Sequence, residues 1–150
     1  MNYWHIQVFN DSEGANEDQK SSARIQELLQ TKQVIGVGDG SNAKNDFEQK
    51  MKAGDIVVVR QGSKAIGLVK VIGEFEDIGA NKTDIKGQEE NIDWMRYRRA
   101  VKFLTLAPSD MGRFVDIRGT LQISLSKGSP TYKYIHSWFR FYRGCIASQA

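Results

Sequence analysis

The stretch that decides the fold runs from Phe47 to Phe75 and reads FEQKMKAGDIVVVRQGSKAIGLVKVIGEF. Its first part predicts a short helix that starts in a capping box of Asn45 and Glu48 and is ended by Gly54. The rest predicts a β-hairpin whose return strand is apolar on both faces. Such a strand belongs inside a closed or covered sheet.

The predicted hairpin joins a β-branched strand, Asp55 to Arg60, to its return strand through a turn at residues 61–64. Strict alternation predicts that one face of the return strand carries Ile66, Leu68 and Ile72, and the other Ala65, Gly67, Val69, Val71 and Gly73. Two glycines on one face allow another segment to approach the backbone closely.

Length and composition are those of one domain, residues 1–150, because 40% of the 150 residues are apolar and 26% are charged. No segment has the length and apolarity of a membrane span. Cys145 is the single cysteine, and His5 and His136 form no ligand-spaced pair. The sequence therefore predicts a cytoplasmic protein with no structural metal and no cofactor.

Charge is distributed unevenly along the chain. Residues 1–90 hold 11 Lys and Arg against 15 Asp and Glu, whereas residues 91–150 hold 10 against 3. The net charge of +3 thus conceals a basic C-terminal part. Such a segment is typical of a surface that binds a polyanion, although a solvated basic surface gives the same count.

The remaining elements surround the hairpin. Before the hairpin, the apolar pattern predicts a half-buried strand at 3–9, a helix at 21–31 and a strand at 34–37. After it, the pattern predicts strands at 94–106, 115–117 and 120–125 and a helix from Ser129-Pro130 to about Tyr142, with Gly144 beyond its end. Loops are predicted at 11–20 and 76–91. Strands outnumber helices and do not alternate with them, which predicts an α+β fold, a small mixed β-barrel with helices packed around it.

Residues with catalytic potential are few. The run Gly36-x-Gly38-x-Gly40 lacks the lysine and hydroxyl residue of a phosphate loop and is better interpreted as a turn beside a ligand pocket. A metal-assisted hydrolase would need its carboxylates from Asp39, Asp55, Glu74, Glu76 and Asp77. Acidic residues at strand ends are more often solvated turns, so we predict no catalytic residues.

Arginines and aromatic residues alternate in the segment Trp94-Met95-Arg96-Tyr97-Arg98-Arg99. Rings stack on bases and guanidinium groups bind phosphates, so this composition suits nucleic acid. The alternative is a core Tyr97 flanked by arginines that only extend to solvent. Trp4 likewise fits either a core or a pocket wall.

Several short motifs together resemble a known superfamily. They are Tyr3-Trp4-His5-Ile6, Ile35-Gly36-Val37-Gly38, Met51-Lys52-Ala53-Gly54-Asp55-Ile56-Val57, Ala65-Ile66-Gly67-Leu68-Val69-Lys70-Val71, Arg98-Arg99-Ala100-Val101-Lys102-Phe103-Leu104 and Gly119-Thr120-Leu121. In this order they resemble the PUA-like superfamily, in particular its EVE-type and YTH-related modules. The nearest resemblance is to the EVE-like N-terminal specificity domains of McrBC-type modification-dependent restriction systems.

The resemblance implies a PUA-like β-barrel of five to six strands whose pocket takes an extruded, often methylated base. By position, Gly38 to Asn42 and the segment from Trp94 to Tyr97 would border the pocket. Many relatives carry an aromatic residue just after the second strand, where this chain has Gly38-Asp39-Gly40. One wall of the pocket would then come from Trp94, Tyr97 or Trp4.

The sequence therefore predicts a nucleic-acid-binding module that recognises a modified base by flipping it, with DNA favoured over RNA. The predicted base-binding residues are Trp4, Gly38, Asp39, Ser41, Asn42, Trp94 and Tyr97, and the predicted phosphate-binding residues are Arg96, Arg98, Arg99, Lys133, Arg140 and Arg143. Cleavage would need an ATPase or nuclease partner or a fused domain. The alternatives are a small hydrolase or nucleotide-processing enzyme on the same barrel and a protein-interaction module.

Overall fold

A computed structural model describes residues 1–7, 22–38, 41–78, 95–108 and 121–149. Within them the elements follow the order β1 (Tyr3–Gln7), α1 (Ser22–Glu27), the π-helix η1 (Leu28–Lys32), β2 (Val34–Gly38), α2 (Lys44–Gln49), β3 (Ile56–Gln61), β4 (Lys64–Val71), β5 (Glu76–Asp77), β6 (Met95–Leu106), β7 (Leu121–Ser124) and α4 (Pro130–Gln149). The predicted loop at 11–20, the strand at 115–117 and most of the loop at 76–91 lie outside these residues.

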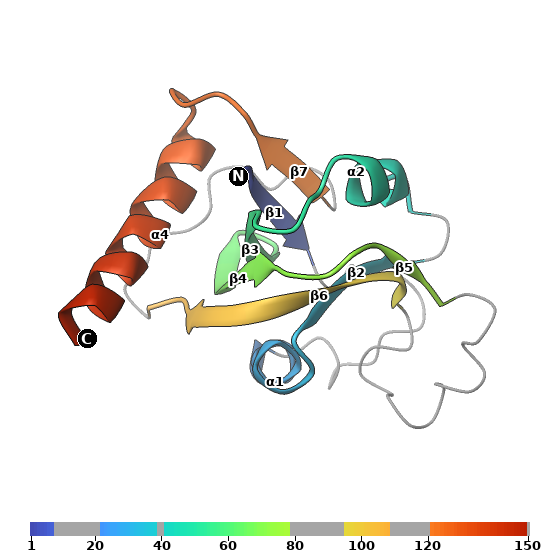
Figure 1. Cartoon of the computed structure of the whole chain (residues 1–150), viewed down its shortest axis with the longest axis horizontal. Coiled ribbons are helices and arrows are strands. Elements are labelled where there is room, and N and C mark those ends of the chain that lie inside the picture. Colours follow the sequence, from blue (N-terminus) through green and yellow to red (C-terminus); the bar gives the residue numbers. More distant parts are fainter. Residues whose placement is uncertain (8–21, 39–40, 79–94, 109–120, 150) are drawn as a thin grey trace.

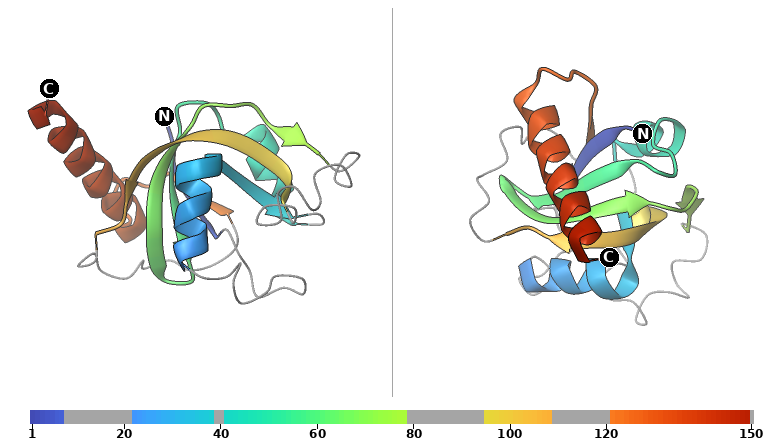
Figure 2. Two further views of the ribbon diagram at one scale, coloured as in Figure 1. Left: turned by 90° about the horizontal axis from the view of Figure 1, so that it is seen from below. Right: turned by 60° about the vertical axis from the view of Figure 1, so that its left-hand side comes forward.

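Six strands follow one another in the sheet in the order β2-β6-β4-β3-β1-β7, and the two-residue β5 pairs with β6 on the edge opposite β2. Neighbours are antiparallel except β1 and β3, which run parallel with Trp4 opposite Val57. The sheet curls strongly, so that β4 and β6 arch over α1 (Figures 1 and 2). The predicted α+β fold with a mixed, barrel-like sheet is confirmed, in the form of a half-barrel.

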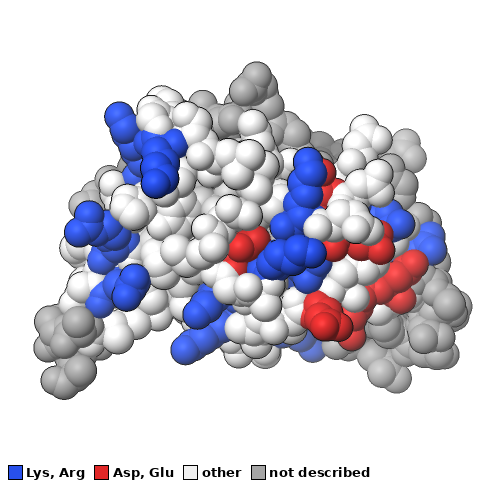
Figure 3. Space-filling model, turned by 45° about the horizontal axis from the view of Figure 1, so that its top comes forward, with Lys and Arg blue, Asp and Glu red and all other residues white. Residues whose placement is uncertain are grey.

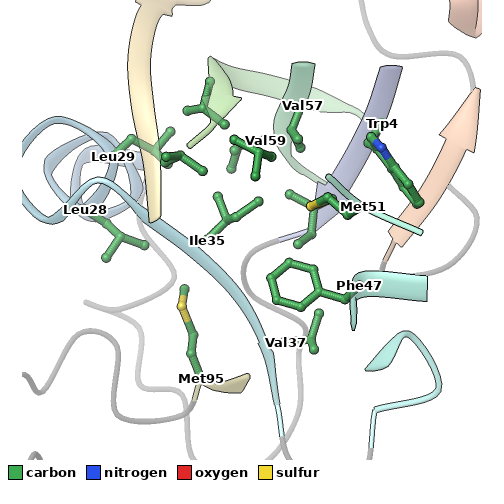
Figure 4. Close-up of a cluster of buried hydrophobic side chains, with 14 of the residues drawn as sticks. Trp4, Leu28, Leu29, Ile35, Val37, Phe47, Met51, Val57, Val59 and Met95 are labelled. Atoms are coloured by element: carbon green, nitrogen blue, oxygen red, sulfur yellow. The ribbon is translucent and has the colours of Figure 1, made fainter. Parts of the chain in front are cut away.

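The concave face of the sheet holds the larger core (Figure 4). Its fully buried side chains come from β1, α1, η1, β2, α2 and the turn after it, β3, β4 and β6, and include Trp4, Leu29, Ile35, Phe47, Met51, Val57, Val59 and Met95. Leu28 and Leu29 bring η1 onto this core, and Phe47 and Met51, four residues apart, do the same for α2 and the turn after it. Helices on this side therefore fill the curl of the sheet.

The convex face is covered by α4. Ile135 and Trp138 pack on Tyr3, Ile56 and Leu68, in a second buried cluster that also contains Val58 and Ala65. The first strand was predicted to be half-buried, but residues 3–6 are all buried because both faces of the sheet are covered.

A β-bulge changes the predicted faces of the hairpin. Val59 lies opposite Gly67 and Arg60 opposite Ala65, so Ile66 has no opposite residue. As a result Ile66 joins the concave core with Val69, whereas Ala65 and Leu68 face α4. The close approach predicted at Gly67 is made by Leu29, whose Cδ1 would lie 2.8 Å from a Cβ added there.

Helix ends also differ from the prediction. α2 begins at Lys44, with Ala43 as its N-cap, so Asn45 lies inside the helix and the predicted capping box is wrong. Gly54 does adopt a left-handed conformation, with φ of 97°, in the turn before β3. In α4 the Ser129 Oγ accepts a hydrogen bond from the Tyr132 N–H at 3.1 Å, the expected cap. This helix continues past Gly144 to Gln149.

One buried carboxylate connects β1 to the corner before β3. Asp55 is 3% exposed and accepts hydrogen bonds from the backbone N–H of Asn2 at 2.9 Å, the Trp4 Nε1–H at 2.9 Å and the Lys52 N–H at 3.0 Å. Two of the donors, Asn2 and Trp4, belong to the chain at the start of β1, and the third, Lys52, belongs to the turn before β3. Asp55 therefore fixes the position of the first strand against the hairpin.

Candidate functional site

The predicted loop and the predicted aromatic strand meet at one end of the sheet. β2 and β6 are paired, with Val37 opposite Tyr97 and Gly38 opposite Met95. After Gly38 the chain turns back through a hydrogen bond from the Ser41 N–H to the Gly38 carbonyl, at 3.2 Å, and enters α2. The structure thus brings together Gly38, Ser41 and the strand that carries Tyr97.

Other predicted base-binding residues are Ser41, Asn42, Asp39 and Trp94. Ser41 Oγ accepts a hydrogen bond from the Ala43 N–H at 3.1 Å, whereas the side chain of Asn42 is exposed. Ser41 therefore shapes the turn that leads into α2. Asp39 and Trp94, both predicted to bind the base, lie outside the described residues.

Tyr97 lies within a group of protein side chains. Its ring is 7% exposed and stacks on Phe75, with centroids 5.6 Å apart and planes 20° apart. Phe75 in turn meets the edge of Phe47 at 6.2 Å. Two cations also lie over the Tyr97 ring: Arg96 with Cζ at 5.1 Å and Lys44 with Nζ at 5.5 Å. A base could stack on Tyr97 only after one of these side chains moves.

The cation nearer to Tyr97 forms an exposed ion pair. Arg96 forms a surface ion pair with Asp77, in which Nε lies 2.9 Å from Oδ1 and Nη2 lies 3.3 Å from Oδ2. The two side chains are 34% and 42% exposed. An exposed pair of this kind stabilises by only about 0–1 kcal/mol. The Arg96–Asp77 ion pair itself therefore adds little to the stability of the fold.

Arg98 and Arg99 were predicted to bind phosphate, but the structure places both in the interior. Arg99 is 5% exposed and donates to three backbone carbonyls, those of Phe47 at 2.9 Å, Gly73 at 3.0 Å and Glu48 at 3.1 Å. Burial lowers the pKa of the Arg99 guanidinium, and nearby carboxylates counteract this. Arg98 is 6% exposed and its Nε donates to the Met95 carbonyl at 2.7 Å. Arg99 thus connects β6 to the backbone of α2 and of the segment after β4, whereas the bond from Arg98 Nε to the Met95 carbonyl stays within β6.

Trp4 also has a structural environment. It is fully buried in the concave core, and its indole N–H is bonded to Asp55. Figure 4 shows its ring among the core side chains near Met51. Of the two interpretations of Trp4 from the sequence, the structure places this residue in the core.

The predicted cations of the last helix are at the surface. Lys133, Arg140 and Arg143 are exposed, and Arg143 lies over the Phe139 ring at 5.7 Å. α4 contains no Asp or Glu. In Figure 3 the side over α4 carries Lys and Arg without acidic neighbours, whereas the opposite side mixes the two signs.

Four of the five carboxylates proposed for a hydrolase are described, and these four form no metal-binding group; Asp39 lies outside the described residues. Asp55 is buried and bonded to three donors, Asp77 is paired with Arg96, and Glu74 and Glu76 are exposed. Among the described residues no three His, Cys, Asp or Glu side chains are placed to hold a metal ion. No described helix is both long and apolar enough to cross a membrane.

Sequence reasoning missed two residues of this site. Phe75 and Lys44 both contact the Tyr97 ring, but neither was singled out. Phe75 ends the segment that decides the fold, and its aromatic character after a strand was the available signal. Lys44 gave no signal, because only the tertiary fold brings α2 to β6.

No protein-family model matches the sequence, and no curated protein matches it. Solved structures do share the fold. Human THYN1 in complex with 5-methylcytosine-containing DNA has a TM-score of 0.53 at 14% identity, over 92% of this chain and 97% of that chain. The YTH domain of Zygosaccharomyces rouxii MRB1 in complex with N6-methyladenosine RNA has a TM-score of 0.52 at 9% identity, over 94% and 86%. PSPTO5229 from Pseudomonas syringae has a TM-score of 0.50 at 13% identity, over 94% and 99%.

Proposed function

Because this chain has the fold of the EVE- and YTH-type PUA-like modules, we propose that it binds nucleic acid and recognises a modified base. One observation supports this most strongly. Two proteins of the same fold form complexes with methylated nucleic acid, one with DNA and the other with RNA. The ligand chemistry common to both is a methylated base. We propose the same class of ligand for this chain, with DNA favoured over RNA.

The base would be turned out of its strand toward the loop after β2. In this proposal Asp39, Ser41 and Asn42 bind the polar edge of the base, with Gly38 allowing close approach, while Trp94 and Tyr97 supply aromatic surface. Extruding a base costs a few kcal/mol of stacking and pairing, which contacts in the pocket must offset. Base–aromatic stacking contributes about 1–3 kcal/mol.

Lys44 and Arg96 provide a route to this state. In the free protein both cations lie over the Tyr97 ring, and Arg96 also forms an exposed ion pair with Asp77. Phosphates next to the extruded base would attract these cations and uncover the ring. Lys133, Arg140 and Arg143 would bind phosphates further along the strand. Arg98, Arg99 and Trp4 take structural roles in this proposal.

The test is a binding panel of duplex DNA and single-stranded RNA, each with and without 5-methylcytosine or N6-methyladenine. We expect one modified ligand to bind more tightly than its unmodified match. Asn42→Ala should reduce this ratio more than it reduces affinity for the unmodified ligand, because a buried polar edge left unpaired costs about 1–3 kcal/mol. Equal binding of every modified and unmodified pair by the wild-type chain would refute the proposed function.

Trp94→Ala gives a second test. It should weaken binding of the preferred ligand roughly ten- to a hundredfold, and Trp94→Phe should restore part of the loss. A large fall in melting temperature with unchanged affinity per folded molecule would instead assign Trp94 to the core. We also propose a cytoplasmic location and an ATPase or nuclease partner for any cleavage, which co-purification with the tagged chain would test.

A further inference from the structure

Two lysines lie directly opposite each other on the convex face of the sheet. The register places Tyr3 of β1 opposite Ile56 of β3, Ile56 opposite Lys70 of β4, and Lys70 opposite Lys102 of β6. Tyr3 and Ile56 belong to the core under α4, so this row lies on the face that α4 partly covers. Both lysines are exposed.

The two lysines are an unfavourable arrangement for the fold alone. Directly opposite residues of an antiparallel pair have Cβ atoms about 4.5–5.5 Å apart, and like charges there are destabilising. Within the described part of the chain neither Lys70 nor Lys102 forms an ion pair. The charge of this pair is thus not neutralised by a neighbouring carboxylate, and an external anion would relieve the repulsion.

The adjacent flank of α4 adds more positive charge. Figure 2 (right) shows α4 lying across the strands, with its C-terminal half toward β6. Arg140 and Arg143 are close enough to Tyr3 to lower the pKa of its phenol, although burial and Tyr132 raise that pKa overall. Tyr3, the first residue of the row, therefore lies near the arginines of α4. The lysine pair of the row and the C-terminal half of α4 contribute four exposed cations: Lys70, Lys102, Arg140 and Arg143.

We propose that this surface, which we call the convex basic face and define by Lys70, Lys102, Arg140 and Arg143, binds the phosphate backbone of the nucleic acid. This inference rests on the proposed function, and it adds a second contact surface that is separate from the loop after β2. The convex basic face lies beside α4, whereas α2 and β5 mark the opposite end in Figure 1. One duplex would contact both by extending past the modified base.

Charge complementarity favours nucleic acid as the occupant. Duplex DNA carries one negative charge per about 1.7 Å of its axis, so cations spread over a strand pair and a helix flank can each meet a phosphate. The other anionic surface to consider is a membrane, since Phe141 and Ile146 of α4 are 68% and 47% exposed. A helix that lies in a membrane surface needs a continuous apolar face, and these two residues alone do not form one.

The experiment measures how affinity for an unmodified duplex of about 20 base pairs depends on salt. The Lys70→Gln/Lys102→Gln and Arg140→Gln/Arg143→Gln variants should each lower the slope of log affinity against log salt by about two, because each lost contact removes about 0.9. A matched control, Lys32→Gln/Lys50→Gln, removes the same charge from other faces and should leave the slope nearly unchanged. Lys70→Arg/Lys102→Arg should retain the wild-type slope.

Folding is monitored by thermal melts, in which Lys70→Gln/Lys102→Gln should melt no lower than wild type, since it relieves repulsion. Unchanged salt slopes in folded variants, with modified-base discrimination retained, would overturn this inference and leave the proposed function standing. Lowered slopes in a chain that never discriminates modified bases would support the convex basic face and refute the proposed function. Loss of binding to phosphatidylserine vesicles, but not to DNA, would also overturn the inference.

Discussion

Removing the carboxylate of Asp55 should destabilise the fold more than any change at an exposed acidic residue. This side chain accepts hydrogen bonds from three donors, the N–H groups of Asn2 and Lys52 and the indole of Trp4, at 2.9–3.0 Å. Asp55→Ala would leave all three donors without this acceptor in a nearly dry environment, because Asp55 is 3% exposed.

The magnitude follows from the number of bonds. A hydrogen bond to a charged group contributes about 1.5–3 kcal/mol net, and bonds that share one acceptor do not add fully. We therefore expect Asp55→Ala to lower the free energy of unfolding by about 3–5 kcal/mol. Asp55→Asn keeps only one acceptor oxygen and turns an NH₂ group toward the other donors, so about 2–3 kcal/mol should be lost.

Urea unfolding and thermal melts measure this effect. For a chain of 150 residues each kcal/mol moves the melting temperature by about 2–4 °C, so Asp55→Ala should lower it by roughly 10 °C. The control is Asp46→Ala, which removes an exposed ion pair with Lys50 and should change the free energy by less than about 0.5 kcal/mol. If Asp55→Ala stayed within about 1 kcal/mol of wild type, the buried carboxylate would not hold β1 in place.

Three further perturbations test other features. Arg99→Lys cannot reach the three carbonyls that the guanidinium holds, so it should cost about 2–4 kcal/mol in urea unfolding while affinity per folded molecule stays unchanged; weaker binding by a fully folded variant would restore a phosphate role. Gly67→Ala would place a methyl group 2.8 Å from Leu29, and thermal melts should show a loss of about 1–3 kcal/mol, whereas an unaltered melt would mean that η1 moves aside freely. The raised pKa of Tyr3 means that the folded state favours the neutral phenol. This contribution to the free energy of unfolding should be fully present below about pH 10 and should fall as the pH rises through the higher pKa of the folded state. In Tyr3→Phe the fall measured by urea unfolding should be shallower but still present, because burial also raises the pKa of Tyr134.

Periodicity of apolar residues was sufficient to predict most of the strands. Alternation and β-branched runs placed the hairpin of β3 and β4 and the long strand β6 within a residue or two. The bulge at Ile66 could not be predicted, because it depends on how β4 pairs with two different neighbours. The continuation of α4 past Gly144 was missed because a glycine inside a helix costs only about 1 kcal/mol, which its neighbours can offset.

The candidate site was less accessible from the sequence. Arg96 and Arg99 belong to the same arginine-rich segment of the sequence. Arg99 is nevertheless buried against carbonyls of distant residues, whereas Arg96 is partly exposed. A charged residue of a strand is normally expected at the surface, and only the tertiary fold supplies the acceptors that allow its burial. The resemblance, and not the residue spacing, placed the loop after Gly38 beside Tyr97.

The parallel pairing of β1 with β3 has a consequence for synthesis on the ribosome. β1 is made first, but its parallel partner follows about 50 residues later and its other neighbour, β7, only near residue 121. At about 5–20 residues per second, a strand that the fold buries on both faces waits several seconds for its second neighbour. Long-range and parallel pairings are also slow to form. During synthesis β1 therefore lacks its second neighbour until β7 has been made, which makes this strand a natural binding segment for a chaperone.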